Sequence, residues 1–139
     1  MKKVSIIFMS LSVLSLAVVC FSAEAPATPL MVKDYEGIAY VSGGIGLDER
    51  EALSAIASEY NLKIVFALKE GNYLADASVL IKNAQGRTVL DAVSDGPWFY
   101  ARLPAGQYAV TVTMMEKANT DKVQIKPAGQ SVLHFYWTE

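Results

Sequence analysis

The spacing of hydrophobic residues changes from a helical period to a strand period near residue 61. Four apolar residues recur at the i, i+3, i+4, i+7 spacing of one helical face, namely Leu53, Ile56, Ala57 and Tyr60. Residues 62–68 then alternate, as a partly buried strand does. A short apolar run at residues 38–41 precedes the helix. The pattern therefore predicts a β-α-β section over residues 37–70.

From residue 71 onward, short hydrophobic runs are separated by turn residues at close spacing. The predicted strands cover residues 77–82, 88–93, 98–103, 108–114, 123–126 and 132–137. The strongest turn is Ser94-Asp95-Gly96-Pro97, since Asp bonds its own backbone and Gly supplies positive φ. Residues 116–121 are predicted to form a polar loop. Six strands at hairpin spacing with no helix between them predict a mainly β, antiparallel β-sandwich over residues 71–139.

The start of the predicted helix carries capping residues. Asp48 is expected to be the N-cap, with Glu51 three residues later completing a capping box, and Asn61 is expected to end the helix. The preceding loop, residues 42–46, is rich in glycine, and free N–H groups at a helix start attract phosphate. The loop lacks the known phosphate-binding patterns, and Asp48 and Glu49 would repel an anion. We interpret it as a tight β-to-α connection.

The N-terminus has the layout of a secretory signal peptide, which we assign to residues 1–23. Two lysines precede an uncharged apolar stretch over residues 4–19. Small residues permit cleavage after Ser22 or after Ala25, so the cut is expected near residues 22–25. Residues 24–36 contain two prolines and are predicted to be a flexible leader. The mature protein is expected to be periplasmic or secreted.

Two other fates of the N-terminus are weighed against cleavage. Lipidation at Cys20 is disfavoured because Val19 stands where a small residue is expected, and a membrane anchor is disfavoured because a spanning helix needs roughly 20 apolar residues. The mature form is therefore predicted to be soluble and not membrane-spanning. Removing the leader also removes the only cysteine, so the mature chain forms no internal disulfide, as is compatible with a bacterial periplasmic domain.

Charge excludes one class of partner. Without residues 1–23, Lys+Arg falls from 12 to 10 while Asp+Glu stays at 14, so the net charge is −4. There is no basic run, which argues against nucleic acid as a partner. A mature chain of about 115 residues is enough for one domain with its own core.

Residues 76–137 carry a pattern that resembles a known family. Alternating Val79 and Ile81 are followed by Gly86, the Ser94-Asp95-Gly96 turn, two aromatics and Leu103-Pro104-Ala105-Gly106-Gln107-Tyr108. This is similar to the carboxypeptidase regulatory-like domain. The resemblance implies a transthyretin-like Greek-key sandwich with a non-catalytic role beside another component and no active site. The chain departs from the family at Met115–Asn119, where a Gly-aromatic pair is usual. Residues 48–68 also resemble the short domain that precedes secretins and TonB-dependent receptors.

Catalytic and metal sites find little support in the residues. His134 is the only histidine, and a triad written with Ser131 or Ser94 and Asp95 has no nucleophile motif around it. A metal site would rest on carboxylates, because the mature chain has one histidine and no cysteine. Asp91 and Asp95 only flank a turn. We predict no catalytic residue, no metal, no cofactor and no enzymatic activity.

The aromatic segment at residues 98–103 permits two registers with opposite surfaces. Strict alternation places Phe99, Ala101 and Leu103 inside and leaves Trp98, Tyr100 and Arg102 exposed, as a possible ligand-contact stripe. The family pattern instead places Trp98 and Tyr100 in the core, with a bend that returns Leu103 to the inside. We favour the family register, because burying Trp98 removes more apolar surface from water than burying Phe99.

The sequence therefore supports two functions. The first is a secreted or periplasmic, non-enzymatic module that contacts an envelope protein through the Thr-rich outer face of residues 108–113 or the edge strand 123–126. The alternative is a module that binds a glycan or another small ligand through exposed Trp98, Tyr100 and Arg102. A third hypothesis, a cryptic hydrolase, depends on His134 as its base.

Overall fold

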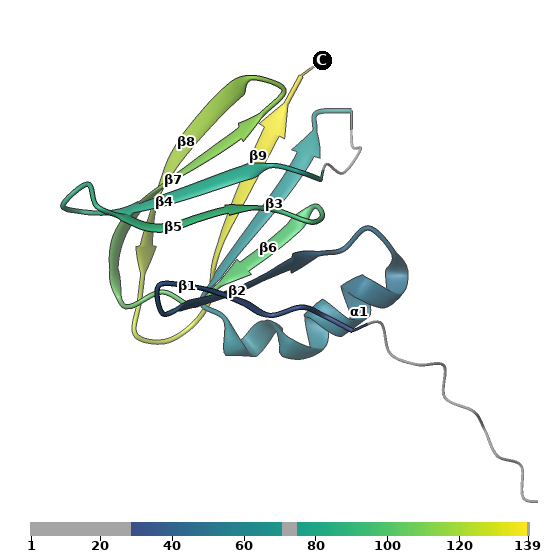
Figure 1. The fold of residues 1–139 in the computed structure, drawn as a ribbon, viewed down its shortest axis with the longest axis horizontal. Helices are drawn as coiled ribbons and strands as arrows, with labels where there is room; N and C mark the ends of the chain where they lie inside the picture. The colour runs from purple at the N-terminus through teal and green to yellow at the C-terminus, as the bar shows by residue number, and fades with distance from the viewer. Residues whose placement is uncertain (1–28, 71–74, 139) are drawn as a thin grey trace, which may run out of the picture.

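Two β-sheets packed face to face form the body of the protein. The computed structural model describes residues 29–70 and 75–138 (Figure 1). The larger sheet has the order β1 (Lys33–Tyr35), β2 (Ile38–Gly43), β6 (Trp98–Ala101), β3 (Leu62–Leu68) and β9 (Ser131–Trp137). The smaller sheet has the order β5 (Thr88–Val93), β4 (Ser78–Asn83), β7 (Gly106–Met114) and β8 (Lys117–Ile125). The prediction of a mainly β protein with two sheets is confirmed.

One strand pair departs from the antiparallel expectation. β3 and β9 run parallel, from the pair Leu62 and Ser131 to the pair Leu68 and Trp137, whereas every other pairing in the described residues is antiparallel. Parallel neighbours require a crossover connection rather than a hairpin. Here the chain between β3 and β9 supplies the whole smaller sheet and β6 before it returns.

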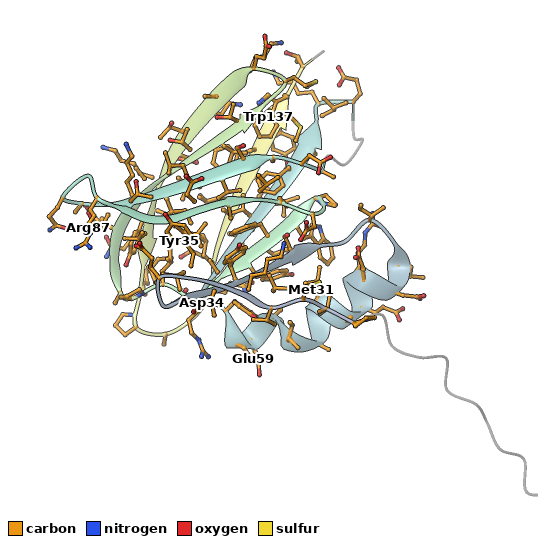
Figure 2. The ribbon with its side chains drawn as sticks, in the orientation of Figure 1. Met31, Asp34, Tyr35, Glu59, Arg87 and Trp137 are labelled. Carbon is orange, nitrogen blue, oxygen red and sulfur yellow. The ribbon has the colours of Figure 1, made fainter. Side chains whose placement is uncertain are left out.

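The core lies between the sheets and follows the alternation of the strands. β3 directs Leu62, Ile64 and Phe66 inward, and all three side chains are fully buried. The facing sheet contributes the alternate positions of its strands, Val79, Ile81, Val110 and Val112 among them. Side chains fill the space between the sheets, and Trp137 lies in this interior near the C-terminal end of β9 (Figure 2). Burial of such side chains, worth about 1.5–3 kcal/mol each, is the main source of stability.

The α-helix of the described residues covers the outer face of part of the larger sheet. α1 (Leu47–Ile56) continues into a 3₁₀ turn at Ala57–Glu59 and buries Leu53 and Tyr60. These two side chains form a second hydrophobic cluster with Val41 of β2 and Tyr100 of β6, and Ile56 and Ala57 pack against it. The apolar stripe predicted from the helical spacing is therefore confirmed.

The β-α-β section predicted over residues 37–70 contributes strands to the sandwich itself. β2 and β3 lie on either side of β6, so that Ala101 is paired with Tyr40 on one side and Leu62 on the other. The section thus shares one sheet with strands from beyond residue 71 instead of only packing against them. The predicted signal peptide lies outside the described residues.

The expectation of a flexible leader up to residue 36 is wrong at its C-terminal end. Lys33–Tyr35 forms β1, which pairs antiparallel with β2. The turn between them is closed by Glu36 and Gly37, both with positive φ (48° and 89°), and the Gly37 N–H donates to the Asp34 carboxylate at 2.9 Å. A two-residue turn of this kind fits the twist of a hairpin.

The predicted polar loop at residues 116–121 is also wrong, because residues 117–121 belong to the nine-residue strand β8. The turn into β8 consists of Met115 and Glu116, with φ of 50° and 59°. Neither residue is common in such a turn, so no turn signal in the sequence marks this hairpin. β8 is an edge strand with much of its length exposed, so its side chains are polar without breaking the pairing with β7.

Side chains of the last strand join the edges of the two sheets. The Trp137 indole N–H donates to the Lys117 carbonyl at 3.3 Å, and the Ser131 hydroxyl donates to the Gln124 carbonyl at 3.1 Å. Both carbonyls belong to β8. The edge strand at residues 123–126, which the sequence offered as a contact surface, is therefore already engaged in part by β9.

Within residues 29–70 and 75–138, no helix combines the length and apolar character needed to cross a membrane.

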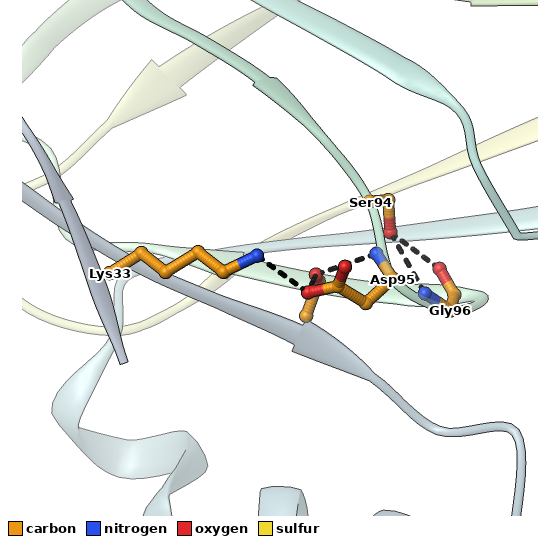
Figure 3. Close-up of polar contacts among 5 residues, drawn as sticks. Lys33, Ser94, Asp95 and Gly96 are labelled. Carbon is orange, nitrogen blue, oxygen red and sulfur yellow. Dashed lines mark hydrogen bonds and ion pairs between the residues drawn. The ribbon is translucent and has the colours of Figure 1, made fainter. Parts of the chain in front are cut away.

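The turn between β5 and β6 connects the edge strand β5 of the smaller sheet to the central strand β6 of the larger sheet (Figure 3). Ser94 is fully buried and donates its hydroxyl to the Gly96 carbonyl. The Asp95 N–H donates to the Ser42 hydroxyl at 2.9 Å, and the Asp95 carboxylate pairs with the Lys33 ammonium at 2.8 Å. The turn therefore holds both β1 and β2 in place.

Gly96 lies so close to β2 that a Cβ at this position would overlap the backbone of Gly43. Gly96→Ala is expected to lower the free energy of unfolding by about 2–4 kcal/mol, since backbone must move on one side or the other. Urea titration followed by tryptophan fluorescence measures the change. Gly46→Ala is the control, because its Cβ meets no atom within 4 Å. Equal losses in the two variants would contradict the proposed close approach.

Candidate functional site

The outer face of the larger sheet carries a set of half-exposed apolar and aromatic residues that the helix leaves uncovered. Strand register places Trp98, Val65 and His134 in one row across β6, β3 and β9, and Lys63 beside Val132 in the next. Tyr136 follows on β9. We call these six residues the β3–β9 face. Their neighbours along each strand point into the core, so the alternation of the strands directs this set outward.

Exposure is highest along β9. Val132 is 46% exposed and Tyr136 is 51% exposed. The His134 and Tyr136 rings stack with centroids 6.2 Å apart. Val65, Trp98 and Lys63 are half-buried. The hydrophobic cluster under α1 includes Trp98 but no residue of β9, so the helix ends its coverage at β6.

Lys63 has a distinctive environment within this face. Its ammonium lies 4.0 Å from the centre of the Trp98 ring and 5.5 Å from that of Tyr100. Burial lowers the pKa of Lys63 from its usual value. In the described parts of the chain, the ammonium forms no hydrogen bond or ion pair, and it lies over the Trp98 and Tyr100 rings. Such cation–π contacts stabilise a desolvated cation only in part.

The three residues predicted for ligand contact do not form one exposed stripe. Tyr100 is 1% exposed and packs against Tyr60, with ring centroids 6.0 Å apart. Its burial raises the pKa of the Tyr100 hydroxyl. Trp98 is half-buried beside Gly44 and Lys63, and only Arg102 is exposed. Tyr100 is thus closed to a ligand.

The structure also resolves the choice between the two registers of residues 98–103. Phe99, Ala101 and Leu103 enter the core between the sheets, as strict alternation requires. Tyr100 and Trp98 enter the second cluster under α1. The register that we favoured is wrong about Phe99, and the alternative is wrong about Tyr100. The physical reason is that β6 is covered on both sides over residues 99–101, because one face meets the opposing sheet and the other meets the helix.

The loop before α1 is the tight connection that we expected, but its capping differs. Gly46 is the N-cap, without a side-chain cap, so the predicted capping box of Asp48 and Glu51 does not form. The carboxylate of Glu49 instead accepts hydrogen bonds from the N–H groups of Gly44 and Ile45, at 2.9 and 3.0 Å. The anion held by this glycine-rich loop is therefore a side chain of the helix itself.

The hypothetical hydrolase residues have separate roles in the structure. The Ser94 hydroxyl donates to Gly96, the Asp95 carboxylate pairs with Lys33, and His134 stacks on Tyr136. The Ser131 hydroxyl donates to the Gln124 carbonyl. Among the described residues, no three His, Cys, Asp or Glu side chains lie close enough together to hold a metal ion.

The smaller sheet carries a second surface feature, a hollow of about 340 Å³. Its lining comes from the β4–β5 turn and the adjoining ends of β7 and β8, namely Asn83, Ala84, Gln107, Tyr108, Ala109, Lys122, Val123 and Gln124. The hollow is open and its lining is mixed polar and apolar. It lacks the convergent polar groups around an enclosed apolar space that characterise small-molecule sites.

Sequence reasoning missed the β3–β9 face, although each strand was predicted. The signal lay in two alternating segments, 62–68 and 132–137, whose outward positions are Lys63 and Val65 in one and Val132, His134 and Tyr136 in the other. Nothing in either segment indicates that the two strands are parallel neighbours. Only that pairing joins the two half-exposed rows into one surface.

Comparison with known proteins gives little to add to this geometry. No family model matches the chain, and no curated protein matches it. Among solved structures, the Bacillus anthracis TIE protein is similar at 21% identity over 55% of this chain, with a TM-score of 0.45. The similar region spans 16% of that chain. The surface must therefore be interpreted from its own chemistry.

The role of Glu49 as a loop ligand is testable by unfolding. Glu49→Ala is expected to lower the free energy of unfolding by about 1–2 kcal/mol, because two loop N–H groups lose a charged acceptor. Glu51→Ala, on the same helix and exposed, serves as the matched control and should change stability by less than about 0.5 kcal/mol. A loss of equal size in both variants would show that only general helix charge matters.

The environment of Lys63 predicts a pH dependence of stability. Because burial lowers the pKa of Lys63 below 10.5, the unfolded chain binds more protons than the folded chain between the two values. The contribution of Lys63 to stability therefore rises with pH through the folded pKa and levels off above the unfolded one. We expect the stability of wild type minus that of Lys63→Gln to rise as the pH increases towards 10.5 and to level off above it. Denaturant titrations at fixed pH measure it, and a flat or falling difference would contradict it.

Proposed function

We propose that this chain is an exported, non-enzymatic β-sandwich module that binds another protein of the cell envelope through the β3–β9 face. The observation that carries the proposal is the uncovered row of apolar and aromatic side chains on β9, with Val132 and Tyr136 each about half exposed. Contiguous exposed apolar surface on a folded domain marks contact sites. Tyrosine and tryptophan are enriched at the centre of protein interfaces.

The glycan alternative has weaker support. A sugar platform requires an aromatic ring with an open face, and the predicted rings are occupied. Tyr100 is buried under α1, and Trp98 lies against Gly44 with the Lys63 ammonium over its ring. The exposed ring of Tyr136 stacks beside His134 instead of standing alone. This arrangement favours a protein surface over a sugar.

We further propose that residues 76–137 are a carboxypeptidase regulatory-like domain with transthyretin-like, Greek-key topology. Support comes from the Leu103–Tyr108 motif, on which the resemblance rests. The Tyr108 hydroxyl donates to the Pro104 carbonyl at 2.7 Å, and Gly106 adopts φ of 154°, so the motif closes a corner between β6 and β7. A closed corner of this kind gives the motif a structural role, in accord with a non-catalytic module.

Export is proposed from the N-terminal pattern, and fractionation tests it. The full chain, expressed with its own N-terminus in a Gram-negative host, is expected in the periplasmic or culture fraction with residues up to 22–25 removed. Intact-mass spectrometry of that fraction gives the new N-terminus. A full-length mass in the membrane fraction would contradict cleavage, and a lipid-modified Cys20 would replace it with lipoprotein processing.

The β3–β9 face can be tested by site-specific cross-linking in cells. A photoreactive amino acid at Tyr136 is expected to give a covalent adduct with one envelope protein, because this side chain is half exposed within the proposed interface. Thr113, exposed on the smaller sheet, is the matched control and should give none. The second variant, Val132→Asp, should abolish the adduct at Tyr136 without lowering the unfolding midpoint. Adducts at Thr113 alone would move the interface to the other sheet.

A further inference from the structure

The Lys63 ammonium is the feature of the β3–β9 face that its own chain leaves unsatisfied. It is half-buried between β6 and β9, and in the described residues it has neither a carboxylate nor a carbonyl as a hydrogen-bond partner. Lys33 shows what the same group does elsewhere in this molecule, since its ammonium pairs with the Asp95 carboxylate at 2.8 Å. A partly desolvated cation without a counter-charge costs free energy that a partner can recover.

The β3–β9 face carries no acidic side chain. Within the β3–β9 face, the ionisable groups besides tyrosine are Lys63 and His134, and none is an aspartate or glutamate. Arg50 of α1 approaches the same Trp98 ring, with its guanidinium carbon 6.0 Å from the ring centre. The carboxylate of Glu49 lies on the Gly44 side, where it is bonded to the N–H groups of Gly44 and Ile45. The face is therefore basic and apolar at once.

We propose that the β3–β9 face recognises a protein segment in which an aspartate or glutamate lies between apolar residues, with its carboxylate bound by Lys63. This inference rests on the proposed protein-binding function and names the chemistry of the partner. Register fixes how such a segment would lie. Lys63 is paired with Val132 across β3 and β9, and Tyr136 lies four residues along β9. A carboxylate at Lys63 thus brings its apolar neighbours onto Val132 and towards Tyr136.

Specific binding requires both the ion pair at Lys63 and the apolar contact on β9. An exposed ion pair contributes little, because water solvates both charges well. Here Trp98, Tyr100 and the sheet remove part of that water from one side of Lys63, so a carboxylate arriving from the open side gains a stronger interaction. The apolar area of Val132 and Tyr136 adds affinity without selecting charge. Lys63 therefore determines specificity, and β9 determines contact area.

The inference is tested with two blocked peptides on the full mature chain. Acetyl-Leu-Glu-Leu-amide and acetyl-Leu-Gln-Leu-amide differ only in the carboxylate. We expect the Glu peptide to bind roughly five-fold more tightly, as seen by NMR shifts of the Trp98 indole and the β9 amides. Lys63→Gln should make the two affinities equal. Lys122→Gln, on the smaller sheet, should leave the preference intact.

Three outcomes would overturn the inference: equal affinities in wild type, no shift of the β9 amides with either peptide, or a Glu preference that survives in Lys63→Gln. If Lys63→Gln does not fold, the wild type alone decides, because the Glu peptide must raise the pKa of Lys63 and the Gln peptide must not. Sodium acetate is the control for a free carboxylate, and it should not shift the β9 amides. A cross-link at Tyr136 without a preference for the Glu peptide would support the β3–β9 face as a protein interface but would reject carboxylate recognition by Lys63. A Glu preference without any cross-link would reject the envelope partner alone.

Discussion

The structure depends on β6, a four-residue strand that is paired on both edges and buried on both faces except at its half-buried first residue, Trp98. Phe99 and Ala101 are fully buried in the core between the sheets, while Tyr100 is buried under the helix. β2 and β3 hydrogen-bond to its two edges. A strand in this position must be apolar at every residue, as buried strands of α/β proteins are. Trp-Phe-Tyr-Ala meets that requirement, and the consecutive aromatics follow from it.

The glycines and polar side chains next to β6 serve the same constraint. Gly96 allows the turn before β6 to lie against Gly43, and the buried Ser94 completes that turn. At the other end of the strand, the Asn61 side chain donates to the Leu103 carbonyl and accepts from the Leu103 N–H, at 2.6 and 2.9 Å. Both ends of β6 are thus fixed by hydrogen bonds to residues of the predicted β-α-β section. The two halves of the chain therefore depend on one another for the central strand.

Local patterns predicted what local physics determines. β3, β5 and α1 followed from alternation and helical spacing, because each has one face buried and one face partly in water. The prediction failed where a partner strand decides. β8 is polar yet paired, since β7 supplies its hydrogen bonds. The burial of Tyr100 depends on α1, which ends 44 residues earlier in the chain, at Ile56. No periodicity in residues 98–103 encodes that helix, so neither register derived from the strand alone was complete.

The same reasoning explains why a binding face exists at all. An α-helix with its side chains is about 10 Å wide and strands are about 4.8 Å apart, so one helix covers roughly two strands. The larger sheet has five strands, and in the described residues α1 packs over β2 and β6 on its outer face. The helix therefore leaves β3 and β9 uncovered, and any apolar side chain that points outward from them is exposed to solvent. Val65, Val132 and Tyr136 are not polar, so in this sheet the lack of a second helix and the choice of outward residues together make a surface suited to another chain.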